Sequence, residues 1–443
     1  ITNPKRLPSN DNANFAAKTL DVKLGEEVGL KYRNSKPNEY SVQKSKLIYC
    51  TDGYILGRLK SNPLLPDLDC VIIDEAHERG VNIDLLLLKL KQLVILRPEF
   101  KLVIMSATIS QEIFENYFPK SKFKFTIVYG GGKTFKPVKE YFLNEIPFLK
   151  QKIIYQTSGK KSILTRSGEL KIQDDKLYLD PMVDIIIHIL KNNIPGDILA
   201  FVGGKGSGSK GVELLKKRLD EEDDKTKNSI YFGVLSSSTE KKTSEIITHE
   251  TKYKEDNPNL SRKVIFSTEV AESSVTIDGL TIVIDSGIVH SSRYYVESNL
   301  DALEKRFIPQ SSHKQRKGRV GRTTPGTCYN LFTQDQYDNL FPEFATAPIY
   351  SDNISGFILD FICQDINYIQ FPFEYPKYNK LIDSKLFNQS TDKQDDNLEF
   401  SELLYELIEP PKSNTVSLTL KRLHTLDCID IKNNRGYSSI IGR

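Results

Sequence analysis

The chain has 443 residues and a net charge of +3, with acidic and basic side chains almost in balance. This length allows two or three domains, and the net charge neither favours nor excludes nucleic acid, because binding depends on where charges cluster. The best candidate for a membrane span, Leu85–Leu96, contains two lysines, so no membrane partner is expected.

Cysteine usage and the start of the chain bear on its compartment. The five cysteines form no CxxC pair, a pattern that favours reduced thiols in the cytosol or nucleus. No secretory signal opens the chain, so we expect a cytoplasmic or nuclear protein. The first residue is Ile1 instead of methionine, and we expect the chain to be a fragment.

Short apolar runs alternate with longer amphipathic ones in the first part of the chain. "CVIIDEA" (70–76) predicts a buried strand, and "NIDLLLLKLKQLVIL" (82–96) predicts the helix behind it, with Asn82 as its N-cap. "KLVIMSAT" (101–108) predicts the next strand. Strands that are apolar on both faces are typical of parallel sheets flanked by helices.

The tetrapeptide "DEAH" (74–77) directly follows the first of these strands. A carboxylate there lies at the carboxyl edge of a parallel sheet, where ligands of such folds bind. Asp74 can hold Mg²⁺, and Glu75 can take a proton from a water that attacks a γ-phosphate. The alternative is a loop of solvated charges. A zinc site is excluded, because the second histidine that it needs is replaced by Val81.

The stretch "FTIVYGGGKTFKPVKEYF" (125–142) resembles a phosphate-binding loop but lacks two of its features. The first glycine of that loop is replaced by Ile127, and Pro137 stands where a helix has to begin. We therefore predict a glycine turn between two strands. If the protein is an ATPase, its phosphate loop lies upstream of Ile1, and this chain alone is expected to hydrolyse no ATP.

The strand and helix rhythm repeats in the second part of the chain. "DILAFVGG" (197–204), "KVIFST" (263–268) and "LTIVIDSG" (280–287) predict strands, and "GVELLKKRLDEE" (211–222) predicts a helix. We infer a second α/β sheet, divided from the first near Gly130–Lys139. For the glycine-rich segment 201–211 we favour a flexible connector over a loop that binds phosphate through its amides.

"QRKGRVGR" (315–322) places Arg316, Arg319 and Arg322 three residues apart. On a helix this spacing keeps them within about 120° of one another. Gly318 and Gly321 cost a helix roughly 1 kcal/mol each, which is more easily explained if a ligand must approach closely. Clustered arginines suit a triphosphate, and the alternative is a solvated basic helix.

Six segments in this order carry a family resemblance: "TNPKRLPS", "TDG", "VIIDEAHERGVNID", "MSAT", "FSTEVAESSVTIDG" and "QRKGRVGR". Together they resemble motifs Ia, Ib, II, III, V and VI of the DEAH/RHA-type superfamily 2 ATP-dependent RNA helicases, which include viral members. The likeness runs from Ile1 to about Thr333 and resumes weakly in segment 407–430. Motif I, the phosphate loop, is absent.

The resemblance implies an α/β fold of two RecA-like parallel-sheet domains followed by the start of a winged-helix domain. We place the domains at residues 1–132, 133–350 and 351–443. The implied function is an ATP-dependent RNA helicase that uses ATP and Mg²⁺ to move along and unwind RNA, either single-stranded or duplex with an overhang. The alternatives are a DNA translocase and a non-catalytic RNA-binding scaffold. An activator protein, the oligomeric state and a virion location stay open.

The resemblance also implies a role for each matching residue around the nucleotide. Asp74 and Glu75 would hold Mg²⁺, and Glu75 would be the base that activates the attacking water. His77 would link this site to the second domain, and Asp278 would lie near the nucleotide. Three side chains from the second domain would meet the γ-phosphate: Gln315, Arg319 and Arg322.

A second implied surface grips the RNA backbone without reading its sequence. Ser106 and Thr108 would couple the state of the nucleotide to this grip. Glu269 stands where the family usually has asparagine, and a carboxylate there would repel RNA phosphate. Tyr294 and Tyr295 fall where the family has a strand-separating hairpin, and we favour ordinary strand aromatics over base stacking. The predicted grip consists of Lys5, Arg6, Thr51, Asp52, Gly53 and Thr268.

Overall fold

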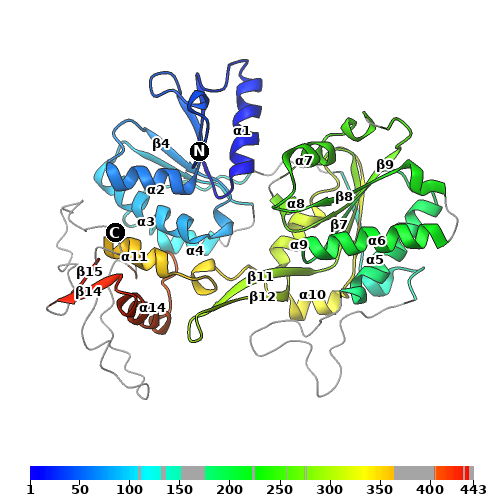
Figure 1. Ribbon diagram of the computed structural model, residues 1–443. Helices are drawn as coiled ribbons and strands as arrows, with labels where there is room; N and C mark the ends of the chain where they lie inside the picture. The colour runs from blue at the N-terminus through cyan, green and yellow to red at the C-terminus, as the bar shows by residue number, and fades with distance from the viewer. Residues whose placement is uncertain are drawn as a thin grey trace. The chain divides into compact units, whose positions relative to one another are not determined.

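The structure is a computed structural model whose residues form two compact units (Figure 1). The first unit comprises residues 1–127, 293–302 and 346–443, and the second comprises residues 128–292 and 303–345. The domain ranges 1–132, 133–350 and 351–443 remain a prediction, because the division into compact units does not test them. No helix in the described part of the chain is both long and apolar enough to cross a membrane. The structure describes residues 1–107, 111–130, 136–150, 175–221, 225–255, 257–273, 275, 277–363, 404, 406–432 and 435–438.

The first unit contains a sheet of five strands in the order β2-β3-β1-β4-β5, and every neighbouring pair is parallel. Parallel strands have their carboxyl ends at one edge, so the segments that follow β1, β3, β4 and β5 meet there. The strands are β1 (Thr2–Asn3), β2 (Val28–Lys31), β3 (Leu47–Thr51), β4 (Cys70–Ile73) and β5 (Lys101–Ile104).

Four helices accompany this sheet: α1 (Arg6–Thr19), α2 (Asp52–Ser61), α3 (Val81–Leu96) and α4 (Gln111–Tyr117). Helix α3 confirms the helix predicted after the DEAH segment, and its run of leucines is buried. The predicted cap is wrong, because Gly80 is the N-cap and Asn82 already lies inside the helix.

The C-terminal segment of the chain belongs to the first unit. It contains α11 (Ser355–Cys363), α14 (Ser413–Thr425) and an antiparallel hairpin of β14 (Ile429–Lys432) and β15 (Arg435–Ser438). Ile358, Leu420 and Leu423 share one hydrophobic core with Leu59 and Leu87 of α2 and α3. Burial of apolar side chains therefore joins this segment to helices that precede it by about 300 residues.

The second unit contains a six-stranded sheet in the order β6-β13-β10-β7-β9-β8, and every neighbouring pair is parallel. Its strands are β6 (Val138–Tyr141), β7 (Asp197–Phe201), β8 (Ile230–Leu235), β9 (Arg262–Ser267), β10 (Leu280–Asp285) and β13 (Gly326–Asn330). Its helices are α5 (Lys176–Lys191), α6 (Lys205–Glu221), α7 (Lys241–Thr248), α8 (Val270–Ser273), α9 (Gln310–Lys317) and α10 (Gln334–Leu340).

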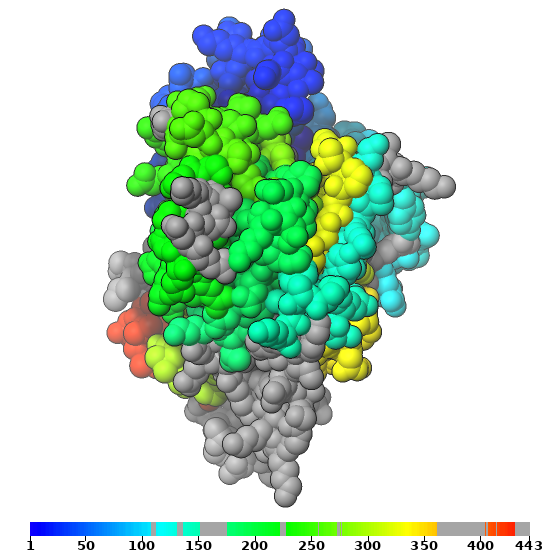
Figure 2. All heavy atoms as spheres, turned by 90° about the vertical axis from the view of Figure 1, so that its right-hand side faces the viewer, coloured from blue at the N-terminus to red at the C-terminus, as the bar shows by residue number. Residues whose placement is uncertain are grey.

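Helices cover both faces of this second sheet. In β7, Ile198 and Ala200 belong to the hydrophobic core that includes α5 and α6, whereas Leu199 and Phe201 belong to the core that includes α7 and α8. Successive strand residues point to opposite faces, so a strand covered on both sides reads as a continuous apolar run. Figure 2 shows the face of this unit on which α5 and α6 lie.

Two predictions about connecting segments are wrong. Residues 123–130 form neither helix nor strand, so only the second strand beside the predicted glycine turn exists, as β6; residues 131–135 lie outside the described part. Helix α6 begins at Lys205, so most of the predicted flexible connector at 201–211 is helical.

The remaining elements are a hairpin of β11 (Ile288–Tyr295) and β12 (Leu300–Phe307), and several short 3₁₀ turns. Tyr294 on β11 is buried, and its hydroxyl donates to Asn299 Oδ1 at 3.0 Å. Arg422 of α14 hydrogen-bonds the same hydroxyl and donates to the carbonyl of Val296 at 2.8 Å. This burial agrees with the strand-aromatic interpretation of Tyr294. The 3₁₀ turns are Pro37–Glu39, Ala76–Glu78, Leu143–Glu145, Lys225–Ser229, Lys252–Lys254 and Pro348–Tyr350.

Candidate functional site

The DEAH segment lies at the carboxyl edge of the first sheet, as predicted. The backbone N–H of Asp74 donates to the carbonyl of Thr2 at 3.0 Å, and that of Ala76 donates to Met105 at 3.0 Å. These bonds hold the segment between β1 and β5. Glu75 has a φ of 53°, a left-handed conformation that costs a non-glycine residue roughly 1–3 kcal/mol. Such strain persists only where the surrounding structure enforces it, which is typical of functional sites.

Three of the predicted site residues meet at this edge. His77 Nε2 lies 3.4 Å from Glu75 Oε2, and Ser106 Oγ lies 3.4 Å from His77 Nδ1. Burial lowers the pKa of His77, so the neutral imidazole is favoured. The histidine therefore connects the DEAH segment with the segment after β5. Thr108, which was predicted to act with Ser106, lies outside the described residues.

The predicted RNA-binding residues of the first unit differ in what they offer to a ligand. Lys5 and Arg6 are exposed, although Lys5 Nζ also pairs with Glu78 Oε1 at 2.7 Å. A Cβ added at Gly53 would meet no atom within 4 Å, so its backbone is open to an approaching ligand. Asp52, by contrast, is only 3% exposed. The carboxylate of Asp52 is therefore not available to an RNA phosphate, and Asp52 can contact RNA only through its main chain.

Asp52→Asn is expected to stabilise the first unit at neutral pH. Burial raises the pKa of Asp52 from 3.8 to about 6, and the charges of Glu78 and Asp74 add to this effect. The stability that protonated Asp52 contributes is complete below pH 3.8 and is lost as the pH rises through about 6. The loss amounts to about 3 kcal/mol at neutral pH.

The measurement is urea unfolding of wild type and Asp52→Asn from about pH 4 to about pH 7. The variant should be more stable near neutrality, and the difference should vanish at the acid end. The exposed Asp69→Asn serves as the matched control and should follow the wild-type profile. Parallel profiles for wild type and Asp52→Asn would show that this carboxyl ionises normally in the fold.

Arg79, at the end of the DEAH turn, is a site residue that sequence reasoning missed. Its Nε and Nη2 donate to Asp84 Oδ1 and Oδ2 at 2.7 and 3.0 Å, and its Nη1 lies 2.9 Å from Glu409 Oε2. Asp84 is fully buried and Arg79 nearly so. The arginine thus ties the DEAH turn to α3 and to the C-terminal segment. An arginine five residues before an aspartate inside an apolar helix was the available signal.

The arginine cluster of the second unit does not lie on one helix, which corrects the prediction. Helix α9 ends at Lys317, so Arg316 alone is helical and Arg319 and Arg322 follow in the next turn. The guanidinium of Arg319 donates to the carbonyl of Val275 at 3.0 Å, and Nε of Arg322 donates to that of Gly318 at 3.3 Å. Both arginines remain candidates for a phosphate ligand.

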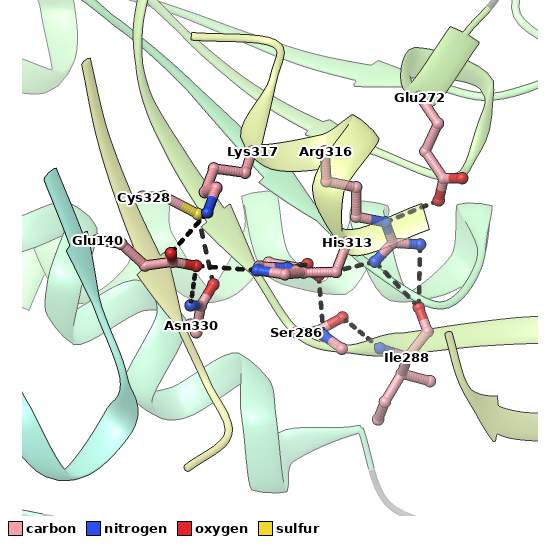
Figure 3. Close-up of polar contacts among 11 residues, drawn as sticks. Glu140, Glu272, Ser286, Ile288, His313, Arg316, Lys317, Cys328 and Asn330 are labelled. Carbon is pink, nitrogen blue, oxygen red and sulfur yellow. Dashed lines mark hydrogen bonds and ion pairs between the residues drawn. The ribbon is translucent and has the colours of Figure 1, made fainter. Parts of the chain in front are cut away.

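Arg316 is fully buried and has a structural environment (Figure 3). Its Nε donates to Glu272 Oε1 at 2.7 Å, and its Nη1 donates to Asp285 Oδ1 at 2.8 Å. The guanidinium also lies over the ring of Phe201, 4.7 Å from its centroid. Two carboxylates and an aromatic face satisfy this cation, so Arg316 holds α8, α9 and β10 together.

His313 extends this buried network to β6. Its Nδ1 lies 2.9 Å from Asp285 Oδ2, and its Nε2 lies 2.9 Å from Glu140 Oε1. Burial favours neutral forms, but the hydrogen bonds and charges within the network outweigh it. They lower the pKa of Asp285 and of Glu140 to about 2 and raise the pKa of His313. The histidine is therefore an imidazolium that donates to both carboxylates.

His313→Gln is expected to abolish an alkaline loss of stability in the second unit. Because the pKa of His313 is raised, the stability from its charge is complete below pH 6.5 and is lost as the pH rises through the folded-state pKa. Urea unfolding at about pH 6 and about pH 9 measures this difference. Wild type should lose stability toward the higher pH by more than the variant does. Equal losses would show that His313 is not charged in the fold.

A cavity of about 410 Å³ opens at the carboxyl ends of the second unit's strands β7, β8 and β9. Two positions in its lining require glycine, because a Cβ at Gly203 or Gly204 would lie 2.9 or 2.8 Å from the ring of His290. Thr268, a predicted grip residue, lies at this cavity. Its lining includes Gly203 to Ser207, Lys210, Ser236 to Ser238, Thr268, Glu269 and His290.

The cavity is rich in groups that bind phosphate. It contains the start of α6, whose free N–H groups favour an anion, and the ammonium groups of Lys205 and Lys210. Lys205 Nζ donates to Ser238 Oγ at 3.1 Å. Asp175 is the buried carboxylate of the lining, and it accepts from Ser207 at 2.8 Å and from Lys305 at 2.7 Å. Segment 201–211, for which a flexible connector was predicted, thus contributes to a concave site.

Of the other predicted residues in the second unit, Asp278 is exposed and Gln315 is partly buried on α9. The carbonyl of Asp278 accepts from the buried ammonium of Lys263 at 3.1 Å. Gln315, Arg319 and Arg322 lie within or directly after α9, and Asp278 precedes β10. The residues of this unit that were predicted to lie near the nucleotide therefore come from two places in the fold, the end of α9 and the start of β10.

Two family models match the chain. The DEAD/DEAH box helicase model covers residues 10–116, and the model of the helicase conserved C-terminal domain covers residues 181–324. Each model lies mostly within one of the two compact units.

Curated relatives match most of the chain. It is 33% identical over 357 residues to a putative ATP-dependent RNA helicase of Acanthamoeba polyphaga mimivirus, with 80% of this chain and 46% of the relative covered. It is 34% identical over 360 residues to the ATP-dependent RNA helicase HrpA of Borreliella burgdorferi, with 81% and 38% covered. The chain spans less than half the length of either relative.

Solved structures show the same fold. The match to the crystal structure of the E. coli DExH-box NTPase HrpB covers 100% of this chain and 44% of the HrpB chain, with a TM-score of 0.70 and 21% sequence identity. A second structure of E. coli HrpB, titled a DEAH/RHA helicase, matches with a TM-score of 0.68. At this identity the likeness is one of fold.

Proposed function

Because this chain belongs to the DEAH/RHA-type superfamily 2 helicases, we propose that its protein couples ATP hydrolysis to movement along RNA and to the unwinding of RNA. The family and the fold of two parallel-sheet α/β domains agree with the sequence prediction. The observation that carries the functional proposal is the DEAH segment at the carboxyl edge of a parallel sheet, where such folds bind ligands.

In this proposal the first unit supplies the groups around the attacking water. Asp74 holds Mg²⁺, and Glu75 accepts the proton of the water that attacks the γ-phosphate. A single carboxylate suits Mg²⁺, which binds one or two carboxylates together with substrate phosphates. The ion neutralises phosphate charge when it is bound.

His77 and Ser106 serve as the connection from this site to the segment after β5. The neutral imidazole of His77 can hydrogen-bond with Glu75 on one nitrogen and with Ser106 on the other, as their 3.4 Å separations suggest. In the second unit, Gln315, Arg319 and Arg322 stabilise the charge that develops on the γ-phosphate, and Asp278 lies near the nucleotide.

RNA is gripped through its phosphates in this proposal. The first unit contributes Lys5, Arg6 and the backbone at Thr51 to Gly53, and the second contributes Thr268 with the cavity beside it. Cations, hydroxyls and main-chain N–H groups bind phosphate without reading the base. The carboxylate of Asp52 has no part in this grip, since it is buried.

The test is ATP hydrolysis by the complete protein with and without single-stranded RNA, followed by unwinding of matched RNA and DNA duplexes that carry an overhang. RNA-stimulated hydrolysis and RNA unwinding are expected. Unwinding of DNA alone would support the DNA-translocase alternative. RNA binding without any hydrolysis would support the non-catalytic scaffold.

A further inference from the structure

One side chain of the second unit's cavity has the wrong charge for a phosphate. Glu269 follows Thr268 at the end of β9, lines the cavity and is exposed. Asp175 is the other carboxylate there, but it is buried and already accepts from Ser207 and Lys305. The carboxylate of Glu269 forms no hydrogen bond or ion pair with the described part of the chain, so its acceptor oxygens are available to a ligand.

The main chain fixes Glu269 at this position. The N–H of Thr268 donates to the carbonyl of Leu235 at 3.1 Å, and the carbonyl of Glu269 accepts from the N–H of Glu272 at 2.9 Å. A ligand in the cavity therefore meets lysines, hydroxyls and the start of α6 together with one carboxylate at the end of β9. These two kinds of group select different parts of a polynucleotide backbone.

The phosphate of a nucleotide is repelled by a carboxylate and attracted by the lysines. Among the groups of the sugar–phosphate backbone, the 2′-hydroxyl of ribose donates a hydrogen bond, and DNA lacks it. We infer that Glu269 accepts a hydrogen bond from a ribose 2′-hydroxyl while the neighbouring phosphate lies against Lys205 and the glycine-rich start of α6. Glu269 is then the residue by which this cavity distinguishes RNA from DNA. This inference rests on the proposed binding of RNA.

The experiment is direct binding of the 443-residue chain to three labelled single strands of one sequence: RNA, DNA and 2′-O-methyl RNA. Wild type should bind RNA more tightly than the other two. Glu269→Ala should reduce the ratio of RNA to DNA affinity by roughly tenfold or more, as the loss of a hydrogen bond to a charged group predicts. Glu269→Gln keeps an acceptor oxygen without the charge, and its ratio should lie between those of wild type and Glu269→Ala.

Two control variants separate this role from simple charge effects. Lys205→Ala should weaken the binding of RNA and DNA by the same factor, because it removes a phosphate contact. Glu250→Ala, an exposed carboxylate of the same unit outside the cavity lining, should leave the RNA to DNA ratio at the wild-type value.

The results that overturn the inference are specific. If Glu269→Ala tightens RNA and DNA equally, the carboxylate only repels phosphate and does not read the sugar. If wild type binds RNA and 2′-O-methyl RNA equally, no 2′-hydroxyl is recognised here. Failure of the wild-type chain to bind any of the three strands would instead contradict the proposed RNA grip, which both this inference and the proposed function require.

Discussion

Arg316→Met is expected to lower the free energy of unfolding of the second unit by about 3–5 kcal/mol. The guanidinium is 0% exposed and pairs with the carboxylates of Glu272 and Asp285. Methionine fills a similar space beside Phe201, but it leaves Glu272 buried without its cation and Asp285 with His313 as its remaining charged partner. Urea or guanidinium unfolding followed by circular dichroism measures the loss.

Arg322→Met is the matched control, because it removes an arginine from the same motif at an exposed position. Its effect on unfolding should be within about 1 kcal/mol. In the complete protein the same variant should lose RNA-stimulated hydrolysis while remaining folded. Equal stability of Arg316→Met and wild type would mean that the buried carboxylates take up protons or find other partners at little cost.

Glu75→Gln is expected to reduce ATP hydrolysis by the complete protein by roughly 10²–10⁴-fold while leaving ATP binding intact. Glutamine keeps the shape of the side chain and its place beside His77, but it cannot accept a proton. Single-turnover hydrolysis measures the chemical step, and binding of a fluorescent ATP analogue measures affinity. The two readouts together distinguish a lost base from a misfolded site.

Glu112→Gln, an exposed carboxylate on α4, provides the comparison and should hydrolyse ATP at the wild-type rate. Normal turnover by Glu75→Gln would remove Glu75 from the mechanism. Lost affinity for ATP would indicate instead that Glu75 acts mainly by holding the metal, which the resemblance also implies.

The central strands and helix α3 could be predicted from the sequence, because elements that are buried on both faces consist of nearly continuous runs of apolar residues. In β7 and β10 most side chains are apolar, and β9 contains the apolar run from Val264 to Phe266, since alternate residues enter two different cores. The DEAH segment could be placed for the same reason, as it follows directly on such a strand. Predictions of this kind use only neighbours in the sequence.

The role of Arg316 could not be predicted in this way. Its spacing from Arg319 and Arg322 suggested one shared helical face, but the helix ends at Lys317. Its partners Glu272 and Asp285 are 44 and 31 residues away. Local spacing gives no sign of such contacts, so a structural arginine and two functional candidates looked alike.

The glycine-rich start of α6 was misread for a related reason. Five glycines within segment 201–211 suggest flexibility, and glycine is unfavourable inside a helix. In the fold, a Cβ at Gly211 would lie 2.5 Å from the ring of Phe266, and one at Gly208 would lie 2.9 Å from Val234. Close packing of α6 against β8 and β9 therefore requires these residues, and composition alone cannot show it.

The core that α11 and α14 share with α2 and α3 limits how this polypeptide can be shortened. A truncation before residue 404 would uncover the leucine-rich side of α3 and would take Glu409 from the Arg79 and Asp84 cluster. Such a product is expected to aggregate, because a wide apolar surface would face water. Helices α11 and α14 complete the hydrophobic core of the first unit, and any attempt to isolate that unit has to retain them.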